Sequence, residues 1–596
     1  MTGHDNGQLA AAVAMPPTVK RRTTVGIAAL ATLLLAACQR PAAQGQHWIE
    51  ADVRQLADDR MEGRRADTRG HARAAAYVSA RFGQMGLLPA GDAGGFLQRV
   101  PLLSATRERA GAAMVMHRDG RDTAFAFADE FLPAPDFNRT ASAVTALAVF
   151  VGQAIQAPES GHDDFAGVDL RGRIAVVLNG APPRLDHDAR AYHGSMRRKL
   201  EVLVAHGAIG AVLLSTRGDE AQRPWARVAA DWAQPTLRLR CTTPACGRVG
   251  GAIDGFPELR AVATVSTRGA SRLFAASGHD YGALLAAADA GTLRGFALPG
   301  TMTLATRTRI TPTVSHNVVA RRPGHGPRAA EHIVFTAHLD HVGIGVPVGG
   351  DAIYNGAMDN ALGVAVMLES ARQLTRAPTP PDRSMLFVAT TAEESGLLGA
   401  EWFTRHPPVP RASLVANLNL DMPMLLAPSE DVIAIGRGHS TLQSVVDAAA
   451  RDVGVDLSPD PAPEQSMFVR SDQYPFVRAG IPAVYLAGGV QGAGWGDDPA
   501  GAARAFMRER YHRPGDDVTQ PIQYADAARL ARLNAAIAQR IAADPRRPRW
   551  LPGDFFGERF GTDIPDRAPP PPRTAQASAP AAGYRAPSSP PDRTFP

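Results

Sequence analysis

Cysteine is scarce in this sequence, with three residues in a chain of 596. Long runs of lysine and arginine are absent outside the N-terminal region and the formal charge is only +5, so nucleic-acid binding is not indicated. The sequence has no internal repeats, and no segment outside the N-terminal region is long and apolar enough to span a membrane. Hydrophobic residues make up 45% of the chain, which is enough for ordinary cores in the two or three domains that its length predicts.

The N-terminal region has the pattern of an export signal. A basic segment at 20–22 precedes an apolar stretch at 25–37, which is shorter than the roughly 20 residues of a membrane span. The stretch ends in Leu-Ala-Ala-Cys at Cys38, which resembles a bacterial lipobox and implies cleavage before Cys38 and lipidation of its thiol. We therefore expect residues 1–38 to be a lipoprotein signal peptide. Because Gln39 follows, we expect an outer-membrane lipoprotein that faces the periplasm. The alternative is an ordinary signal or a short anchor helix.

The other two cysteines, Cys241 and Cys246, are close to each other in the sequence. An oxidising periplasm would permit a disulfide that closes the small loop between them. The alternative is a pair of ordinary thiols, and the sequence leaves this choice open.

Composition divides the rest of the chain into four parts. Residues 47–135 begin with two helical patterns and form the N-terminal part of the main domain. Residues 136–290 are predicted to be a smaller inserted domain, α/β or β-rich, because turn-strand and helix-turn-strand patterns occur there. Residues 291–545 contain the rest of the main domain. Residues 546–596 are rich in proline, cannot bury a core and are predicted to be a disordered tail.

The main domain is predicted to be an α/β fold. Apolar runs typical of buried strands alternate with helical patterns, for example at 361–374 and 441–454. Such alternation is typical of a mostly parallel or mixed sheet flanked by helices. The predicted strands cover residues 316–322, 332–338, 384–391, 414–421 and 481–488.

Histidine and acidic residues follow several of these predicted strands. Taken alone, the sequence His-Leu-Asp-His at 338–341 could be a polar loop after a strand. In an open α/β sheet, however, the functional site lies beyond the carboxyl ends of the strands, so groups from several strands meet at one edge. Chance could place one such residue at the end of a strand, but it is a poor explanation for so many. The candidate residues are His338, Asp340, Asp359, Glu393, Glu394, Asp421 and His512.

These residue types suit a site with two metal ions. Two imidazoles and three carboxylates can hold two divalent ions if one carboxylate is shared. Nitrogen and oxygen ligands without thiolate fit zinc, and manganese or cobalt could also occupy such a site. Two ions about 3.5–4 Å apart can share a water molecule and lower its pKa. Glu393 and Glu394 are adjacent and point different ways, so one can bind metal while the other acts as a general base.

The order of the motifs resembles that of zinc metallopeptidase family 28, which comprises di-zinc aminopeptidases and glutamate-carboxypeptidase-like enzymes. Residues 315–517 contain H-x-D, NGAMDNALGV, AEESGLLGA, NLNLDM and YHRPGDD in that order. The N-terminal segments LADDRMEGRRADTRG and FGQMGLLPAG also resemble this family. The inserted domain, with VDLRGRIAVVLNG and AHGAIGAVLL, resembles a protease-associated domain. The resemblance covers most of the mature chain and implies the di-zinc exopeptidase fold.

The resemblance also implies a role for each candidate residue. One Zn²⁺ would be bound by His338 and Asp421, the other by Glu394 and His512, and Asp359 would bridge the two ions. This set implies two Zn²⁺ per chain.

Two further roles follow from the resemblance. Glu393 would be the general base, and Asp340 would hydrogen-bond His338 and fix its orientation. The neighbouring His341 is expected to be a supporting or incidental histidine and not a ligand.

Some positions depart from the family pattern. Met358 and Gln473 stand where the family often has aspartate and histidine, and Arg513 stands where it commonly has a small polar residue. These departures could alter the substrate pocket and leave the metal ligands intact. Asp472 and Asp516 are expected to hold loops by hydrogen bonds to the backbone.

The sequence therefore predicts an exported, lipid-anchored zinc aminopeptidase, a metallo-exopeptidase that acts on peptides. The first alternative is other amide chemistry on the same fold, either carboxypeptidase action on acidic dipeptides or glutaminyl cyclisation. A complete two-metal ligand set argues against the cyclase, because cyclases of this fold tend to work with one zinc. The second alternative is a receptor-like binding protein, which would have no use for the general base Glu393.

Overall fold

The computed structural model describes residues 44–275 and 277–561. The predicted signal peptide, the lipidation site Cys38 and most of the predicted tail lie outside the described residues. Within the described part of the chain, no helix combines the length and the apolar character that a membrane crossing requires.

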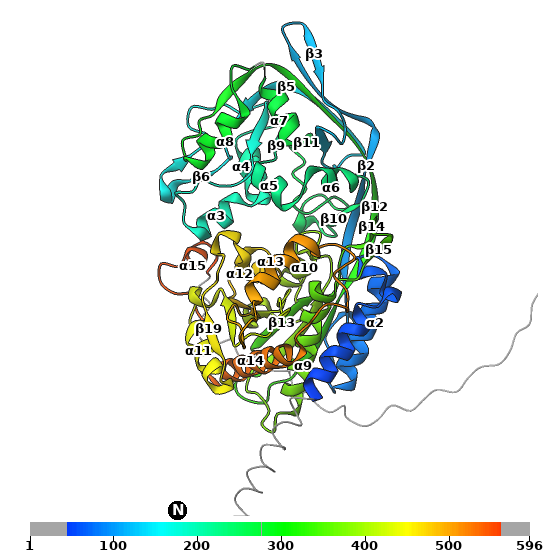
Figure 1. Cartoon of the computed structure of the whole chain (residues 1–596), viewed down its shortest axis with the longest axis vertical. Coiled ribbons are helices and arrows are strands. Elements are labelled where there is room, and N and C mark those ends of the chain that lie inside the picture. Colours follow the sequence, from blue (N-terminus) through cyan, green and yellow to red (C-terminus); the bar gives the residue numbers. More distant parts are fainter. Residues whose placement is uncertain (1–43, 276, 562–596) are drawn as a thin grey trace, which may run out of the picture.

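The lower lobe in Figure 1, which we call the main lobe, is built around a mixed sheet. Its central strands are parallel and lie in the order β20 (Ala483–Gly488), β17 (Leu414–Asn419), β13 (His332–His338) and β16 (Ser384–Thr390). At the two sides, β12 (Phe296–Arg322) is antiparallel to β16, and β18 (Asp431–Ile435) is antiparallel to β20. A short strand, β19 (Asp456–Ser458), pairs with β18. The five strands predicted for this sheet are all present, and the α/β fold class is confirmed.

Helices cover both faces of this sheet because successive side chains of each strand point to opposite sides. Ile333 and Phe335 are buried on one face, and Val334 is buried on the other. The first face packs against the helical residues 44–56 and against α2 (Arg69–Gln84), α9 (Leu362–Arg376), α11 (Leu442–Val453), α13 (Pro499–Glu509) and α14 (Tyr524–Ala543). The second face packs against α10 (Leu398–Arg405) and α12 (Gln473–Arg478).

Two long strands join the main lobe to the upper lobe of Figure 1. Strand β2 (Leu97–Arg118) is antiparallel to β12, and their pairing extends from Leu97 opposite Val318 to His117 opposite Thr301. At its far end, β2 forms a hairpin with β3 (Arg121–Ala124), which projects from the upper lobe. Hydrogen bonds therefore continue from the sheet of one lobe into the sheet of the other.

The upper lobe, which we call the insert lobe, consists of residues 119–295 together with the outer halves of β2 and β12. It has the α/β character predicted for the insert. Apart from β3 and the short pair β6 (Gln156–Ala157) and β7 (His162–Asp163), its strands are β4 (Phe131–Pro133), β5 (Ala141–Phe150), β8 (Ile174–Leu178), β9 (Gly210–Leu214), β10 (Thr236–Leu239) and β11 (Ala261–Val265). Its helices are α3 (His187–Gly194), α4 (Met196–Ala205), α5 (Arg217–Gln222), α6 (Trp225–Ala230), α7 (Thr267–Phe274) and α8 (Tyr281–Asp289).

The insert lobe is larger than the predicted range 136–290. Strand β4 precedes residue 136 but pairs with β11, deep in the insert lobe. The outer part of β12 follows residue 290 and pairs there with β5. The boundaries differ from the prediction because β2 and β12 are continuous strands that serve both lobes, so no change in composition marks the crossing.

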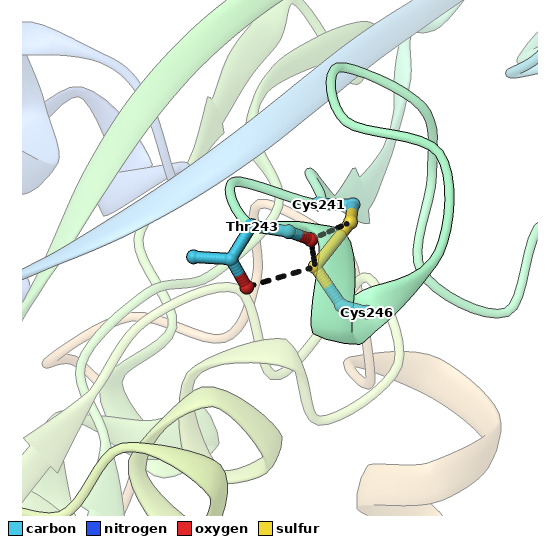
Figure 2. Close-up of a disulfide and its surroundings, with 3 residues drawn as sticks. All are labelled: Cys241, Thr243 and Cys246. Atoms are coloured by element: carbon cyan, nitrogen blue, oxygen red, sulfur yellow. Dashed lines mark hydrogen bonds between the residues drawn. A yellow bond between two sulfur atoms is a disulfide. The ribbon is translucent and has the colours of Figure 1, made fainter.

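A disulfide joins Cys241 and Cys246, which settles the choice left open by the sequence. Figure 2 shows the two cysteines at either end of a tight loop around Thr243. Cys241 is buried and packs in a cluster with Leu239 of β10 and Trp402 of α10. The closed loop therefore lies at the junction of the two lobes.

The packed part of the chain continues beyond residue 546, where a disordered tail was predicted to begin. Helix α15 (Phe555–Phe560) places Phe556 in a buried cluster with Tyr485. The indole nitrogen of Trp550 donates a hydrogen bond to the carbonyl of Gly480 at 2.9 Å. Burial of these aromatic rings stabilises the packing of this segment on the main lobe. The proline-rich composition gave no indication of this contribution.

Candidate metal centre

The carboxyl ends of β13, β16 and β17 bring predicted site residues to one edge of the sheet. His338 is the last residue of β13 and lies opposite Thr390 at the end of β16. Glu393 and Glu394 follow β16, and Asp421 follows β17. Because these strands are parallel and in register, side chains far apart in the sequence meet at one place, as the sequence predicts.

Asp359 reaches the same edge from the loop that precedes α9. The carboxylate of Asp516 accepts hydrogen bonds from the main-chain nitrogens of Met358 at 2.8 Å and Asp359 at 3.0 Å. This contact with the backbone agrees with the loop-holding role expected for Asp516. Since Asp516 follows His512 by four residues, the same contact ties the Asp359 loop to the segment that carries His512.

The side chain of Asn360 ties this loop to a second segment. Its amide donates to the carbonyl of Leu420 at 2.9 Å, and its oxygen accepts from the nitrogen of Met422 at 3.2 Å. These two residues flank Asp421. These two hydrogen bonds therefore fix the positions of Asp359 and Asp421 relative to each other.

Arg64 lies beneath this arrangement as a buried cation. Its guanidinium donates to the main-chain carbonyls of Leu56, Leu339, Asn355 and Gly356 at 2.6–2.9 Å. Burial lowers its pKa to about 10, and nearby carboxylates, Asp516 first among them, oppose that shift, so the group stays charged at neutral pH. Arg64 therefore connects the N-terminal helical segment to the loops that carry the candidate ligands.

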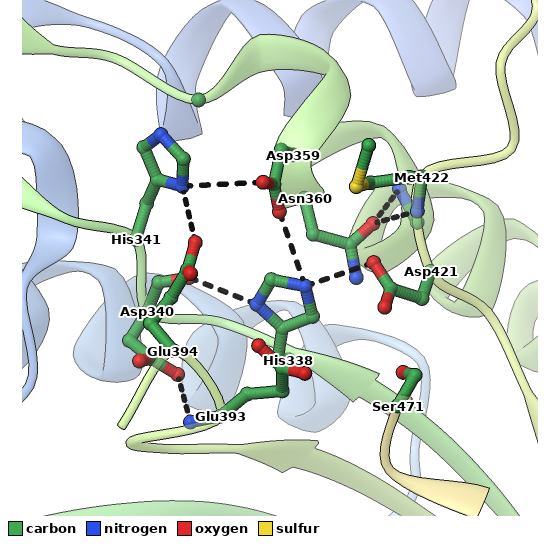
Figure 3. Close-up of polar contacts among 12 residues, drawn as sticks. His338, Asp340, His341, Asp359, Asn360, Glu393, Glu394, Asp421, Met422 and Ser471 are labelled. Carbon is green, nitrogen blue, oxygen red and sulfur yellow. Dashed lines mark hydrogen bonds and ion pairs between the residues drawn. The ribbon is translucent and has the colours of Figure 1, made fainter. Parts of the chain in front are cut away.

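The first group of possible ligands contains His338, Asp359 and Asp421. The Nε2 atom of His338 lies 2.9 Å from Asp421 Oδ1 and 3.3 Å from Asp359 Oδ1. All three residues are buried, and their ligand atoms lie within 4.8 Å of one another. Figure 3 shows His338 between the two carboxylates.

The second group contains Asp359 again, with Glu394, His512 and His341. The Nε2 atom of His512 lies 3.2 Å from Asp359 Oδ2 and 3.0 Å from Glu394 Oε2. The ligand atoms of this group also lie within 4.8 Å of one another. Asp359 thus presents one carboxylate oxygen to each group, which is the arrangement that a bridging ligand requires.

His341 belongs to this second group, although the sequence interpretation gave it only a supporting or incidental role. Its Nδ1 atom lies 2.7 Å from Glu394 Oε1 and 3.7 Å from Asp359 Oδ2. Figure 3 draws both contacts as dashed lines. Its other nitrogen, Nε2, is buried and has no hydrogen-bond partner among the described residues. In the sequence, the only indication of this role was the second histidine of the pattern His-x-Asp-His. What the sequence could not supply was the turn after β13 that directs both imidazoles to the same edge.

The contacts of Asp340 differ from the prediction. Its side chain does not bond to His338. Its Oδ1 atom accepts a hydrogen bond from the main-chain nitrogen of Glu393 at 3.1 Å, while Nδ1 of His338 bonds to its main-chain carbonyl at 3.0 Å. Asp340 therefore orients His338 through its backbone and positions Glu393 through its carboxylate.

Asp472 also has a different partner from the one expected. Its carboxylate accepts a hydrogen bond from the hydroxyl of Thr390, at the end of β16, and not from the backbone. Gln473 accepts a hydrogen bond from the side-chain nitrogen of Asn419 at 2.7 Å. Both residues hold strand ends beside the site and lie outside the two ligand groups.

The imidazoles and carboxylates of the two groups strongly influence one another's pKa values. Burial disfavours the charged forms of His338 and His512, but adjacent carboxylates more than offset it. They raise the pKa of His338 well above its usual value and that of His512 to about 10. The pKa values of the carboxyl groups of Asp359 and Glu394 shift in the opposite direction. Burial opposes ionisation, yet the imidazoles lower the pKa of Asp359 well below its usual value and that of Glu394 to about 2.

Glu393 has different electrostatic surroundings from Glu394. Burial raises the pKa of Glu393 well above its usual range, His338 opposes the shift, and Asp421 and Glu394 reinforce it. Its carboxylate has no hydrogen-bond or ion-pair partner among the described residues. Glu394, by contrast, contacts both His341 and His512. The two adjacent glutamates therefore have distinct environments, and only Glu394 belongs to a ligand group.

A cavity of about 370 Å³ opens onto the second ligand group. Its inner wall includes His341, Glu394 and His512. Much of the opposite wall comes from the insert lobe, from the end of α5 through α6 to β10. Any ligand of the candidate metal centre would therefore also meet side chains of the insert lobe.

The sequence is similar to those of known peptidases. Residues 317–538 match the model of peptidase family M28. The chain is 27% identical over 259 residues to leupeptin-inactivating enzyme 1 of Streptomyces exfoliatus, which covers 42% of this chain and 53% of that enzyme. It is also 27% identical over 223 residues to aminopeptidase YwaD of Bacillus subtilis strain 168, which covers 36% of this chain and 46% of that protein. The chain thus spans about half the length of these curated relatives.

A solved aminopeptidase structure from Aneurinibacillus sp. strain AM-1 is 19% identical, covering 83% of this chain and 93% of that chain, with a TM-score of 0.47. A likeness at this level carries no functional information.

Metal binding to this site is expected to release protons. Without metal, the raised pKa values keep His338 and His512 protonated at pH 7.5, and a metal ion must displace those protons to reach Nε2. Zinc binding to the metal-free protein should release about two protons per chain, and its affinity should fall as the pH is lowered. Titration calorimetry in two buffers of different ionisation enthalpy measures the protons released. A binding enthalpy that does not depend on the buffer would contradict this expectation.

Proposed function

We propose that this chain, in which residues 317–538 form a domain of peptidase family M28, is a zinc-dependent aminopeptidase that removes N-terminal residues from peptides. The observation that supports this most is the shared carboxylate of Asp359, which faces one ligand group with each oxygen. Beside this pair of groups stands Glu393, a carboxylate that binds none of their members. This arrangement suits hydrolysis of an amide by an activated water molecule.

The residues present fit two zinc ions. Three imidazoles and several carboxylates converge on a buried space, and Nε2 of His341 has no hydrogen-bond partner among the described residues. Such a concentration of buried acidic groups is costly unless cations compensate it. His338 and Asp421 would hold one ion, Glu394, His512 and His341 would hold the other, and Asp359 would bridge them. When bound, zinc would polarise the scissile carbonyl and lower the pKa of the attacking water.

Glu393 would serve as the general base. The hydrogen bond from its main-chain nitrogen to Asp340 fixes where its side chain begins, and Asp340 in turn follows His338 by two residues. A carboxylate whose pKa is raised by burial holds a proton more readily than an ordinary glutamate does. It can therefore take a proton from water and pass it to the nitrogen of the departing amine.

We further propose that the protein is an exported lipoprotein anchored through Cys38 and that the insert lobe is a protease-associated domain. The basic and apolar segments before Cys38 support export. The disulfide between Cys241 and Cys246 is typical of an oxidising compartment such as the periplasm.

Substrates with free and blocked N-termini test the proposed activity. The zinc-loaded protein is expected to cleave leucyl peptides and to leave their N-acetylated forms intact, because an aminopeptidase requires the free amino group. Metal analysis should find about two zinc equivalents per chain, in line with the two ligand groups. Cleavage of blocked and free peptides at equal rates, measured by chromatography of the products, would refute aminopeptidase action.

The role of Glu393 is tested by Glu393→Gln, which keeps the size of the side chain and removes its basicity. The variant should retain its zinc and lose on the order of 10²- to 10⁴-fold in kcat, the usual contribution of a general base. Glu464→Ala, an exposed glutamate remote from both ligand groups in the sequence, is the matched control and should keep the activity of the parent. If Glu393→Gln were as active as this control, another group would have to be the base.

The anchor is tested by Cys38→Ser in the expressing bacterium. Without the thiol no lipid can be attached, so the protein should move from the membrane fraction to the soluble fraction. Fractionation identical to that of the parent protein would disprove the lipoprotein assignment.

A further inference from the structure

The cavity above the second ligand group is rich in arginine. Arg65 lines it from the main lobe, and Arg223, Arg227 and Arg238 line it from the insert lobe. Asp231 is the acidic residue of the insert lobe in this lining, and it already forms an ion pair with Arg223 at 2.9 Å. The remaining acidic residues of the lining belong to the candidate metal centre.

Arg65, Arg227 and Arg238 form no ion pair with any of the residues that the structure describes. Their side chains donate instead to main-chain carbonyls, which are uncharged. Arg65 bonds to Pro235 at 3.3 Å, Arg227 to His512, and Arg238 to Leu237 at 2.9 Å and Ser395 at 3.4 Å. Three guanidinium charges in one cavity therefore have no matching anion from the protein.

Two of these arginines lie immediately beside the second ligand group. Arg227 contacts the carbonyl of His512 itself, and Arg238 contacts the carbonyl of Ser395, the residue after Glu394. Bound zinc would neutralise the carboxylates of the metal centre, so the cavity as a whole would be positive.

The sign of this charge indicates which part of a substrate faces the arginines. An aminopeptidase substrate has a protonated amino group on one side of the scissile bond, and three guanidiniums would repel it. The other side, which departs as the new amine, carries a carboxylate when the peptide is short. One residue spans about 3.3–3.6 Å, so the C-terminal carboxylate of a dipeptide lies about that far beyond the scissile carbonyl.

We propose that Arg65, Arg227 and Arg238 form a subsite for a carboxylate on the leaving side of the substrate, which makes short peptides with a free C-terminus the preferred substrates. The proposal rests on the aminopeptidase function proposed above and adds the substrate class. Arginine suits this role because its planar guanidinium binds carboxylates through paired hydrogen bonds. The cavity volume of about 370 Å³ is near the lower end for small-molecule sites, which also favours a short ligand.

The same subsite could receive a carboxylate from an acidic side chain, and three substrates separate the sources. They are the dipeptide Leu-Ala, its amide Leu-Ala-NH₂, and Leu-Asp-NH₂, whose carboxylate is on the side chain. The zinc-loaded parent protein should cleave Leu-Ala with a kcat/KM about 10- to 100-fold higher than Leu-Ala-NH₂, because a hydrogen bond to a charged group contributes a factor of that size. A rate for Leu-Asp-NH₂ equal to that for Leu-Ala would support the subsite and show that it also accepts side-chain carboxylates.

Substitution of the arginines tests whether they are the cause. In Arg227→Gln and in Arg238→Gln the ratio of kcat/KM for Leu-Ala over Leu-Ala-NH₂ should fall by about tenfold or more toward one. The matched control is Arg268→Gln, an exposed arginine on α7 of the same lobe that does not line the cavity, and its ratio should equal that of the parent. Thermal melting and zinc content identify any variant that has lost its fold.

The possible failures are distinguishable. Equal rates for all three substrates in the parent protein would overturn the carboxylate subsite and leave the aminopeptidase function standing, and this comparison needs no variant. A parent preference for Leu-Ala that survives in both arginine variants would overturn the assignment to these residues. If the zinc-loaded protein cleaved none of the three substrates, the proposed function itself would fail.

Discussion

Both halves of the candidate metal centre depend on the position of one carboxylate, that of Asp359. One of its oxygens lies near His338 and the other near His512, so a shift of the loop before α9 would disturb both ligand groups together. The protein holds that loop by main-chain hydrogen bonds to Asp516 and by the side chain of Asn360. These contacts are buried and do not compete with water, which makes them a rigid support for a site that needs accurate geometry.

Positively charged side chains from both lobes lie near this loop. In the main lobe, the fully buried Arg64 supplies a fixed positive charge near several carboxylates, and none of the described carboxylates forms a direct ion pair with it. Above the site, Arg227 and Arg238 approach from the insert lobe and donate only to carbonyls. Cations from both lobes therefore lie close to the acidic centre, which reduces the electrostatic cost of gathering several carboxylates in one buried place.

The sequence predicted the elements of the main lobe well, because apolar runs such as 332–338 and 384–391 are buried on both faces and have few alternatives to a central strand. Parallel pairing then brought residues from separate strand ends together, so the site could be anticipated. His341 could not be assigned, since its direction depends on the turn after β13 and not on spacing. The arginines of the cavity were also missed, because their position depends on how two lobes far apart in sequence face each other. The start of the tail was misplaced because the burial of Phe556 depends on a distant partner, Tyr485.

The shared strands β2 and β12 set the distance between the two lobes. They rise by about 3.4 Å per residue and alternate their faces with a period of two. An insertion of two residues in each strand would raise the insert lobe by roughly 7 Å and keep every side chain on its original face, whereas a single-residue insertion would turn the faces over. The number of paired residues between Leu97 and His117 therefore sets the distance from the metal centre to the arginines of the insert lobe. This distance can change only in steps of whole residues. A longer or shorter ladder would therefore hold the insert lobe at a different distance from the metal centre without changing the ligand groups.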